Sequence, residues 1–395
     1  MEGRAQRLRR LAPLAFAAAA SQALLVVLAP IIVAVARDLD ASVSAVGQAR
    51  ALTAAVAVAI SVWLSTRIGQ LGVARVIAVG GALAIASCGI VAAAPSLGVF
   101  LAAHVLLGVA FACLVSGGFA GVGAFPAGER ARATGYVAAS NAVAWIVINP
   151  LAGALAERAS WRLAFALPAA FALAALLTVR GAEPLPARSA RLPLRTFVAE
   201  ASARRWIVSE TVAFGTWTAL LTFIGAFFIA EVGLSAAAAG WALAGSAAAY
   251  FAASVRSGWL VARFPRRRLV AAGALVMAGL VPLLLTVGHD HAAVAVLLFC
   301  LVGGVAGVRT PSSTSLGLEQ LPNDPGAMMA VRAGATQLGY LIGAVSGGIV
   351  IAAGGYVALG PVLAVGLVAS ALLVLRVRDP LEDRFGPRAP LAGES

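Results

Sequence analysis

A charged residue, Arg309, stands inside a long apolar run, in the stretch GVAGVRTPSST. An arginine at the centre of a membrane-spanning helix costs about 2.5–3.5 kcal/mol on insertion scales, so it usually faces a partner or a polar cavity. Pro311, two residues later, loosens the helix and frees backbone carbonyls. We expect Arg309 to bind an anionic or polar group of a substrate. The alternative is that it pairs with backbone carbonyls or reaches toward the membrane surface.

His104 is the second candidate, because in the stretch LAAHVLLG it has only apolar neighbours. A histidine side chain titrates near neutral pH, which suits a proton relay or a polar substrate contact. A neutral histidine that hydrogen-bonds to the backbone explains the same pattern. Both interpretations stay open.

Amide and aromatic side chains within apolar segments form the third group. Amides in such places either join helices by hydrogen bonds or line a cavity. Aromatic residues could form a cavity wall, or pack against lipid and neighbouring helices. The amides are Gln22, Asn141, Asn149 and Gln337, and the aromatic residues are Trp145, Trp217 and Tyr340.

Enzymatic and metal chemistry find no support in the sequence. No phosphate-binding glycine loop is present, which excludes the usual ATP-driven pumps. The three cysteines have no metal-ligand spacing, and His289-Asp290-His291 is a poor metal site. We expect no catalytic residue, no metal and no cofactor. The suspected energy source is a proton gradient, coupled through His104, Glu210 or Asp38.

The composition indicates that these residues lie in a bilayer. Hydrophobic residues make up 61% of the chain and charged residues 11%. In soluble proteins about half of the residues are apolar and about a quarter are charged. A helix crossing about 30 Å of hydrocarbon needs roughly 20 apolar residues. On that basis we predict an all-α membrane protein with twelve transmembrane helices. They cover 11–36, 44–65, 74–94, 97–124, 132–156, 162–179, 206–230, 236–261, 268–287, 292–317, 328–353 and 356–377.

Six spans precede and six follow a segment rich in proline and arginine. We therefore predict three parts: an N-terminal six-helix bundle at 1–180, a linker at 181–205, and a C-terminal bundle with a short tail at 206–395. If the N-terminus is cytoplasmic, 23 arginines lie on that side and four, Arg37, Arg50, Arg158 and Arg162, on the other. By the positive-inside rule both termini are cytoplasmic. The same asymmetry explains the net charge of +13 without nucleic acid, which we do not expect as a partner.

Two similar stretches indicate that the two halves are internal repeats. SVWLSTRIGQLG begins at Ser61 and SGWLVARFPRRR at Ser257, and each closes the second span of its half. Repeats of this kind are common in transporters.

In these stretches the chain resembles the major facilitator superfamily, and within it the twelve-span bacterial drug and sugar efflux permeases. That family carries Gly-x-Leu-Ala-Asp-Arg-x-Gly-Arg-Arg between its second and third spans. Arg67, Gly69, Gly258 and Arg263 match it, whereas Thr66 and Ala262 replace the aspartate. A second family signature, Gly-Pro-x-x-Gly-Gly followed by Trp-Arg-x-x-Phe, is similar to the chain at 149–153 and 161–165.

The resemblance implies a central cavity between two bundles that rock about it, with Arg67, Gly69, Gly258 and Arg263 in loops that hold one state. Because burying polar groups in lipid is costly, the polar and aromatic side chains deep in the spans are the candidates for substrate binding or coupling. They are Gln22, His104, Asn141, Asn149, Trp217, Arg309, Gln337 and Tyr340.

The leading hypothesis is proton-coupled efflux of a small organic molecule by a monomer in the bacterial inner membrane. The first alternative is an importer or facilitator of an organic anion that uses Arg309. The second is a membrane sensor or scaffold that does not transport.

Overall fold

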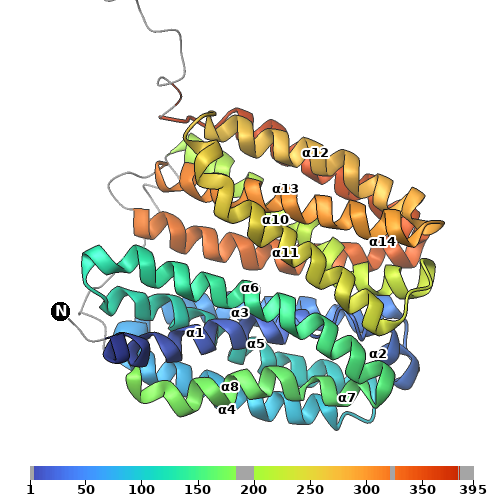
Figure 1. The fold of residues 1–395 in the computed structure, drawn as a ribbon, viewed down its shortest axis with the longest axis horizontal. Coiled ribbons are helices and arrows are strands. Elements are labelled where there is room, and N and C mark those ends of the chain that lie inside the picture. The colour runs from blue at the N-terminus through green and yellow to red at the C-terminus, as the bar shows by residue number, and fades with distance from the viewer. Residues whose placement is uncertain (1–3, 184–199, 321–324, 381, 383–395) are drawn as a thin grey trace, which may run out of the picture.

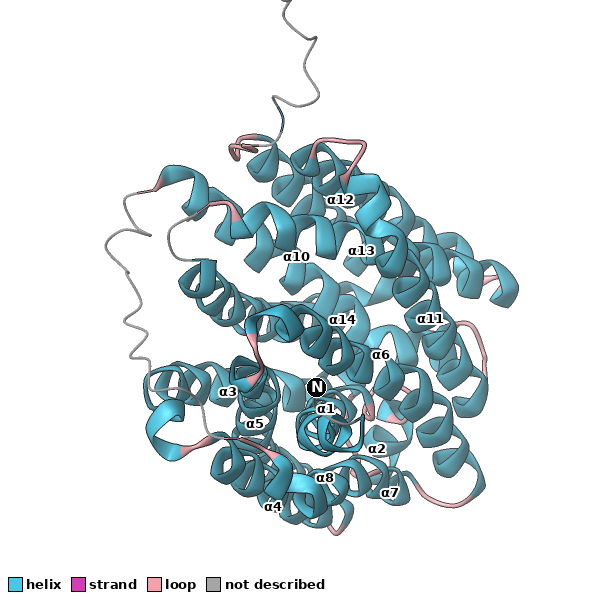
Figure 2. Cartoon of the chain, turned by 60° about the vertical axis from the view of Figure 1, so that its left-hand side comes forward, coloured by secondary structure: helices cyan, strands magenta, loops and turns pink. Residues whose placement is uncertain are grey.

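The structure, a computed structural model, describes residues 4–183, 200–320, 325–380 and 382, and in those residues it contains helices and connecting loops only (Figure 2). The first bundle is the blue-to-green part of Figure 1. Its helices are α1 (Arg4–Val26), α2 (Ile32–Asp38), α3 (Val43–Leu71), α4 (Val73–Ala92), α5 (Leu97–Ala120), η1 (Gly121–Ala124), α6 (Ala127–Arg158), α7 (Trp161–Ala164), α8 (Ala166–Thr178) and η2 (Val179–Gly181).

The second bundle lies beside the first and is coloured yellow to red in Figure 1. Its helices are α10 (Ala201–Ala226), η3 (Phe227–Glu231), α11 (Ala236–Val261), α12 (Arg266–Thr286), η4 (Val287–His289), α13 (Ala292–Leu318) and α14 (Pro325–Leu375). Because α10 begins at Ala201, Arg204 and Arg205 lie in a helix and not in the predicted linker. Residues 184–199 of the predicted linker, 181–205, fall outside the described residues.

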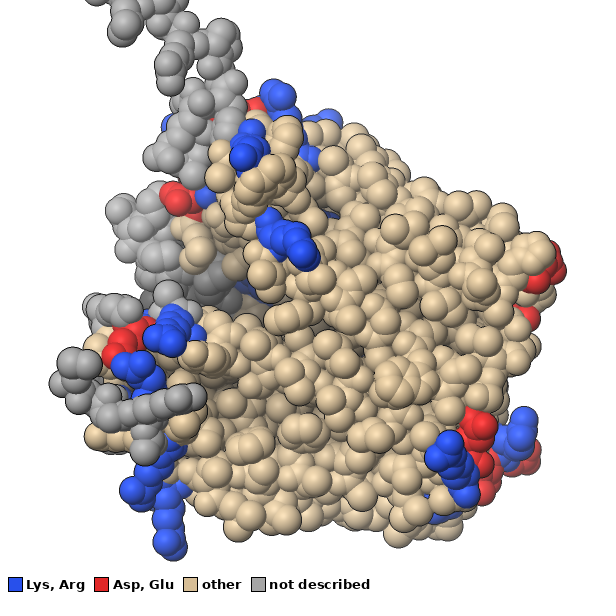
Figure 3. All heavy atoms as spheres, in the orientation of Figure 1, with Lys and Arg blue, Asp and Glu red and all other residues tan. Residues whose placement is uncertain are grey.

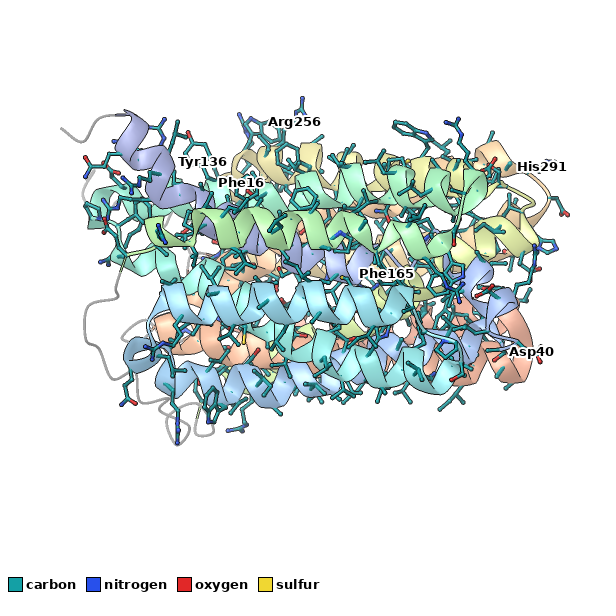
Figure 4. All side chains as sticks on the ribbon, turned by 90° about the horizontal axis from the view of Figure 1, so that it is seen from below. Phe16, Asp40, Tyr136, Phe165, Arg256 and His291 are labelled. Carbon is teal, nitrogen blue, oxygen red and sulfur yellow. The ribbon has the colours of Figure 1, made fainter. Side chains whose placement is uncertain are left out.

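The surface has the charge distribution of a membrane protein. On the face shown in Figure 3, charged side chains gather at two opposite ends and leave an uncharged band between them. Figure 4 places Asp40 and His291 at one end and Tyr136 toward the other. We call the end with Tyr136, the N-terminal turn of α1 and Arg266 the arginine-rich end, and the end with Asp40 and His291 the far end.

Ten helices among the described residues are long and apolar enough to cross a membrane, so the predicted count of twelve is not reached by this criterion. Two regions account for the difference. The predicted first span, 11–36, is broken into α1 and α2 by a turn that contains Pro30. The last two predicted spans are counted together as α14, although Gly355, with φ of 67°, kinks it where the sequence predicts a turn.

Serine caps explain where several helices begin at the far end. Ser42, Ser96 and Ser235 each accept a hydrogen bond from the backbone N–H three residues later, at the starts of α3, α5 and α11. Such caps satisfy one of the N–H groups that a helix start leaves without a partner. At the same end, Asp38 pairs with Arg162, 2.5 Å apart, and the hydrogen bond from that guanidinium lowers the pKa of the Asp38 carboxyl.

The two repeated stretches adopt related arrangements at the arginine-rich end. The Arg67 guanidinium lies 5.3 Å from the ring centre of Trp63, and the Arg263 guanidinium lies 3.8 Å from that of Trp259. A cation over an indole face is attracted by the ring's electron density. Gly69 and Gly258 have open space around them. The stretches therefore agree in local contacts as well as in sequence.

A buried ion pair between Arg266 and Asp379 joins the start of α12, just after the second repeated stretch begins its loop, to the segment that follows α14. Asp379 accepts hydrogen bonds from Nη2 of Arg266 at 2.6 Å, from its Nε at 3.1 Å and from its backbone N–H at 2.9 Å. Arg266 also donates to the carbonyl of Ser315 on α13, 2.9 Å away. Arg266 is 2% exposed, so it is part of the packed bundle, where the sequence predicts a loop residue.

Close helix contacts join the two bundles at the far end. Gly153 and Gly240 lie where α6 meets α11: a Cβ atom at Gly153 would be 2.1 Å from the carbonyl oxygen of Ala236, and one at Gly240 would be 2.4 Å from that of Asn149. Gly225 of α10 approaches the carbonyl oxygen of Ala29 in the same way. A side chain at any of these positions would push the bundles apart, so the far end is closed by glycine contacts.

Replacing Gly240 with Ala is therefore expected to weaken the closed far end by about 1–3 kcal/mol, the usual cost of an extra methyl group in a packed contact. The measurement is the rate at which a maleimide labels a cysteine at Ala237, in a background without the native cysteines. We expect faster labelling. Gly279→Ala is the matched control, because nothing lies within 4 Å of a Cβ there. An unchanged labelling rate in Gly240→Ala would contradict this assignment.

Candidate functional site

A cavity of about 640 Å³ lies between the two bundles. Its walls come from α1 and α6 of the first bundle and from α10, α11, α12, α13 and α14 of the second. The α6 residues run from Gly135 to Trp145, in the half of that helix nearer the arginine-rich end. Since the far end is closed by the glycine contacts, the cavity belongs to the arginine-rich side of the molecule.

A buried carboxylate with two arginines forms the charged part of the site. Glu210 of α10 is fully buried. Its Oε1 lies 3.1 Å from Nη2 of Arg309 on α13, and its Oε2 lies 3.1 Å from Nε of Arg332 on α14. Both arginines line the cavity. Two positive charges and one negative charge leave this cluster with a net charge of +1.

Both arginines keep hydrogen-bond donors for something else. Nε of Arg309 and Nη2 of Arg332 are buried, and neither has a hydrogen-bond partner among the described residues. A buried donor without a partner costs more than a hydrogen bond usually contributes, and the cost is larger for a charged group. Guanidinium donors suit carboxylate and phosphate oxygens. Two arginines of the cavity wall therefore each keep a buried cationic donor without a partner in the described part of the chain, and such donors fit an anion.

Hydroxyl groups position this cluster from the side away from the cavity. Nη2 of Arg309 also donates to Oγ of Ser370, 3.3 Å away, and Ser370 pairs with Ser209 at 2.9 Å between the hydroxyl oxygens. Ser209 is the residue before Glu210 on α10, and it is 1% exposed. These contacts hold Arg309 where it can reach both Glu210 and the cavity.

Aromatic side chains supply much of the remaining wall. Phe214 packs edge-to-face with Tyr340, with ring centres 6.0 Å apart, and the Arg332 guanidinium lies 5.3 Å from the Phe214 ring centre. On the opposite bundle, Nε1 of Trp145 donates to Oε1 of Gln22 at 2.9 Å. Trp217 also lines the cavity. The cavity thus combines a cationic position with flat apolar surfaces, which suits a ligand that carries both an anionic group and an aromatic ring.

The structure brings together most of the residues that the sequence singles out. Those that line the cavity are Gln22, Asn141, Trp145, Trp217, Arg309 and Tyr340.

Three predicted residues lie elsewhere. His104 is 4% exposed, its Nδ1 lies 2.7 Å from the carbonyl oxygen of Phe100, and its ring packs on that of Phe100. This geometry matches the hydrogen-bonded alternative for His104. Asn149 donates to the carbonyl of Trp145 and sits at the far-end contact of α6 with α11. Gln337 is 8% exposed, with its Oε1 unpaired among the described residues.

Sequence reasoning missed the role of Arg332 and the partners of Glu210. In the sequence, Arg205 stands five residues before Glu210 and favours a local charge pair, but in the structure Nη1 of Arg205 donates to the carbonyl of Arg376. Arg332 lies inside the predicted span 328–353 but is counted only among the arginines of the cytoplasmic side; in the structure it stands about two turns after the start of α14 and lines the cavity. A signal existed in this position, since it places a charge inside an apolar segment. Its partner, 122 residues away, could not be read from spacing.

Comparison with known proteins adds two findings. The family model described as Major Facilitator Superfamily matches residues 11–228 and, again, residues 206–393. The chain is 29% identical over 384 residues to a Pseudomonas aeruginosa protein named "Transcription regulatory protein OpdE", and the match covers 92% of each chain. Together the two family matches span both bundles.

Proposed function

Because the chain belongs to the major facilitator superfamily of transporters, we propose that it moves small organic anions through the cavity between its two bundles. The bundles rock about the bound molecule, so that the cavity faces one side of the membrane and then the other. The observation that supports an anionic substrate best is the pair of unpartnered donors on Arg309 and Arg332.

Electrostatics favours an anion over a neutral or cationic molecule. The cavity-lining residues among those described include two arginines and no Asp or Glu, because Glu210 lies behind them. In a site of low dielectric constant, a net charge of +1 attracts a negative group strongly. The aromatic wall formed by Phe214, Trp217 and Tyr340 gives the rest of the substrate a flat surface to pack on.

Proton coupling, which the sequence suggests, has its most suitable group in Glu210. A proton on this carboxylate removes its charge and weakens its ion pairs with both arginines. A substrate anion and Glu210 therefore compete for the same two cations, and a proton shifts that competition toward the substrate. Proton and anion then move in the same direction, so this coupling favours the alternative of import wherever the proton gradient points inward. His104 is less suited to this role because its ring is packed away from the cavity.

For direction and location we propose efflux across the bacterial inner membrane, with both termini in the cytoplasm, by a monomer. The arginine asymmetry in the sequence supports that orientation. With the arginine-rich end inside, the cavity of this structure is on the side from which a molecule destined for export would enter. Import by the same site is the alternative direction.

The second candidate function is a sensor that binds a small molecule without moving it. It is favoured by the printed name of the Pseudomonas aeruginosa relative, a transcription regulatory protein. The replacement of the family's loop aspartate by Thr66 and Ala262 also favours it, because that carboxylate is expected to help hold one state. A sensor would bind the same ligand in the same cavity.

Flux through purified protein in proteoliposomes separates these functions. The assay uses labelled benzenesulfonate, which stays anionic at any pH of the experiment, together with aromatic carboxylates and phosphate esters. Benzenesulfonamide serves as the uncharged match. We expect saturable flux of an anion that responds to a pH gradient, and none of the amide. Absence of flux for all anions, in both directions and with a gradient of either sign, would favour the sensor.

A further inference from the structure

A third arginine, Arg50, is buried just beyond the closed end of the cavity. It lies on α3 and is 6% exposed. The sequence places it inside the predicted span 44–65 and counts it among the four arginines of the outer side. Its Nη1 donates to the carbonyl oxygen of Leu25 on α1, 3.3 Å away. Leu25 stands three residues after the cavity-lining Gln22, about one turn farther along α1 toward the far end. The Arg50 side chain therefore ends within about one helical turn of the cavity wall.

This part of α3 belongs to the contact between the two bundles. Oγ of Ser44 donates to the carbonyl of Gly348 on α14, 2.7 Å away. A Cβ at Gly47, one turn before Arg50, would lie 2.3 Å from Cε1 of Phe223 on α10. Tyr340 of α14 lies near Arg50, and it also lines the cavity. Opening the far end must separate these contacts and uncover the surroundings of Arg50.

The charge of Arg50 is poorly compensated in the closed state. An arginine stays protonated in proteins and carries five N–H donors. Among the described residues Arg50 makes one hydrogen bond and no ion pair, and its buried Nε has no acceptor. Burying an unpaired charge is costly, whereas a neutral polar residue such as glutamine would avoid the charge. A buried arginine that destabilises the closed state and has no ion-pair partner in it among the described residues fits a role in another conformational state of the protein.

We propose that Arg50 binds the anionic group of the substrate when the cavity faces the far end. Arg309 and Arg332 hold that group when the cavity faces the arginine-rich end, and Tyr340 separates the two positions. The donors that Arg50 leaves unused are of the kind that hold a carboxylate, sulfonate or phosphate with two parallel hydrogen bonds. This inference rests on the proposed function, because it assumes that an organic anion passes through the cavity.

The test measures transport separately from each face, in right-side-out and inverted membrane vesicles, with labelled benzenesulfonate as the probe. Arg50→Gln is expected to raise KM at least about 30-fold for substrate offered at the far end, and less than about 3-fold at the arginine-rich end. The KM of Arg50→Lys for substrate offered at the far end should fall between that of the wild type and that of Arg50→Gln. Arg37→Gln, an exposed arginine at the far end, is the matched control and should leave both values unchanged. An equal effect of Arg50→Gln on both faces, or none, would overturn the proposal.

If the wild type transports no anion, that result rejects the proposed function. A second measurement then tests the role of Arg50 separately. It compares the thermal midpoint of unfolding of the purified wild type and Arg50→Gln in detergent. If Arg50 serves to bind a ligand, Arg50→Gln unfolds at the same midpoint as the wild type or at a higher one, because the variant lacks the uncompensated buried charge. A residue that holds α1 to α3 lowers the midpoint when it is replaced, and that result would also overturn the proposal.

Discussion

Replacement of Arg309 with Gln is expected to lower kcat/KM for an organic anion at least about 30-fold. Glutamine keeps a polar side chain, although a shorter one, and removes both the charge and the guanidinium group with its unpartnered donor. Loss of one partner from a buried charged contact costs about 2–5 kcal/mol, and each 1.4 kcal/mol corresponds to a factor of ten. The measurement is the initial rate of benzenesulfonate uptake into proteoliposomes across a range of concentrations.

The matched control is Arg256→Gln. Arg256 is an arginine within α11 that is exposed, as Figure 4 shows, and its Nη1 donates to the carbonyl of Ala252 in its own helix. We expect transport by this variant within about twofold of the wild type, in line with the small effects of exposed charges. Equal losses in the two variants, or unchanged anion transport in Arg309→Gln, would remove Arg309 from the binding site.

Replacement of Glu210 with Gln is expected to destabilise the protein by about 3–5 kcal/mol, the usual result of removing one member of a buried ion pair. Glu210 bridges two helices through Arg309 and Arg332, so its loss leaves two buried positive charges without an anion. The measurement is the free energy of unfolding in detergent. If Glu210 also carries the coupled proton, the residual transport should lose its response to a pH gradient.

Two further variants show whether the missing negative charge of Glu210 causes the loss of stability. The double variant Glu210→Gln with Arg332→Gln returns the cluster to a net charge of +1 and should recover part of the stability. Glu129→Gln is the surface control, because Glu129 pairs with Arg7 at 3.0 Å while about a third exposed, and its loss should cost about 0–1 kcal/mol. A loss below about 1 kcal/mol for Glu210→Gln would contradict the bridging role.

Much of the fold was predictable because a bilayer imposes simple rules on sequence. Long apolar segments predict helices, and the helices of both bundles lie within a few residues of the predicted spans. The turn near Gly355 was predicted from two adjacent glycines and is confirmed by its positive φ. Prediction failed at Pro30, where the first segment breaks, because hydropathy alone does not report a change of direction.

The candidate site was predictable only in part. A charged residue in an apolar segment indicates a high free energy of membrane insertion, but the sequence does not tell which residue pairs with it. Arg309 stood out for that reason. Glu210 lies near the start of α10 and Arg332 near the start of α14, where charges are ordinary, so their convergence depends on how the helices pack. Arg50 was counted among the arginines of the outer side although it lies inside the predicted span 44–65, and its burial between the bundles emerges only in three dimensions.

Alternating movement of the two bundles is the central claim, and a cross-link at the far end tests it most directly. Oε2 of Glu157 on α6 accepts a hydrogen bond from the backbone N–H of Ala237 on α11, 3.0 Å away, so cysteines at these positions lie across the contact between the bundles. Joining Glu157→Cys to Ala237→Cys with a short, reducible bifunctional reagent, in a variant without the native cysteines, should stop anion flux in proteoliposomes, and reduction should restore it. Undiminished flux through the cross-linked protein would contradict the account.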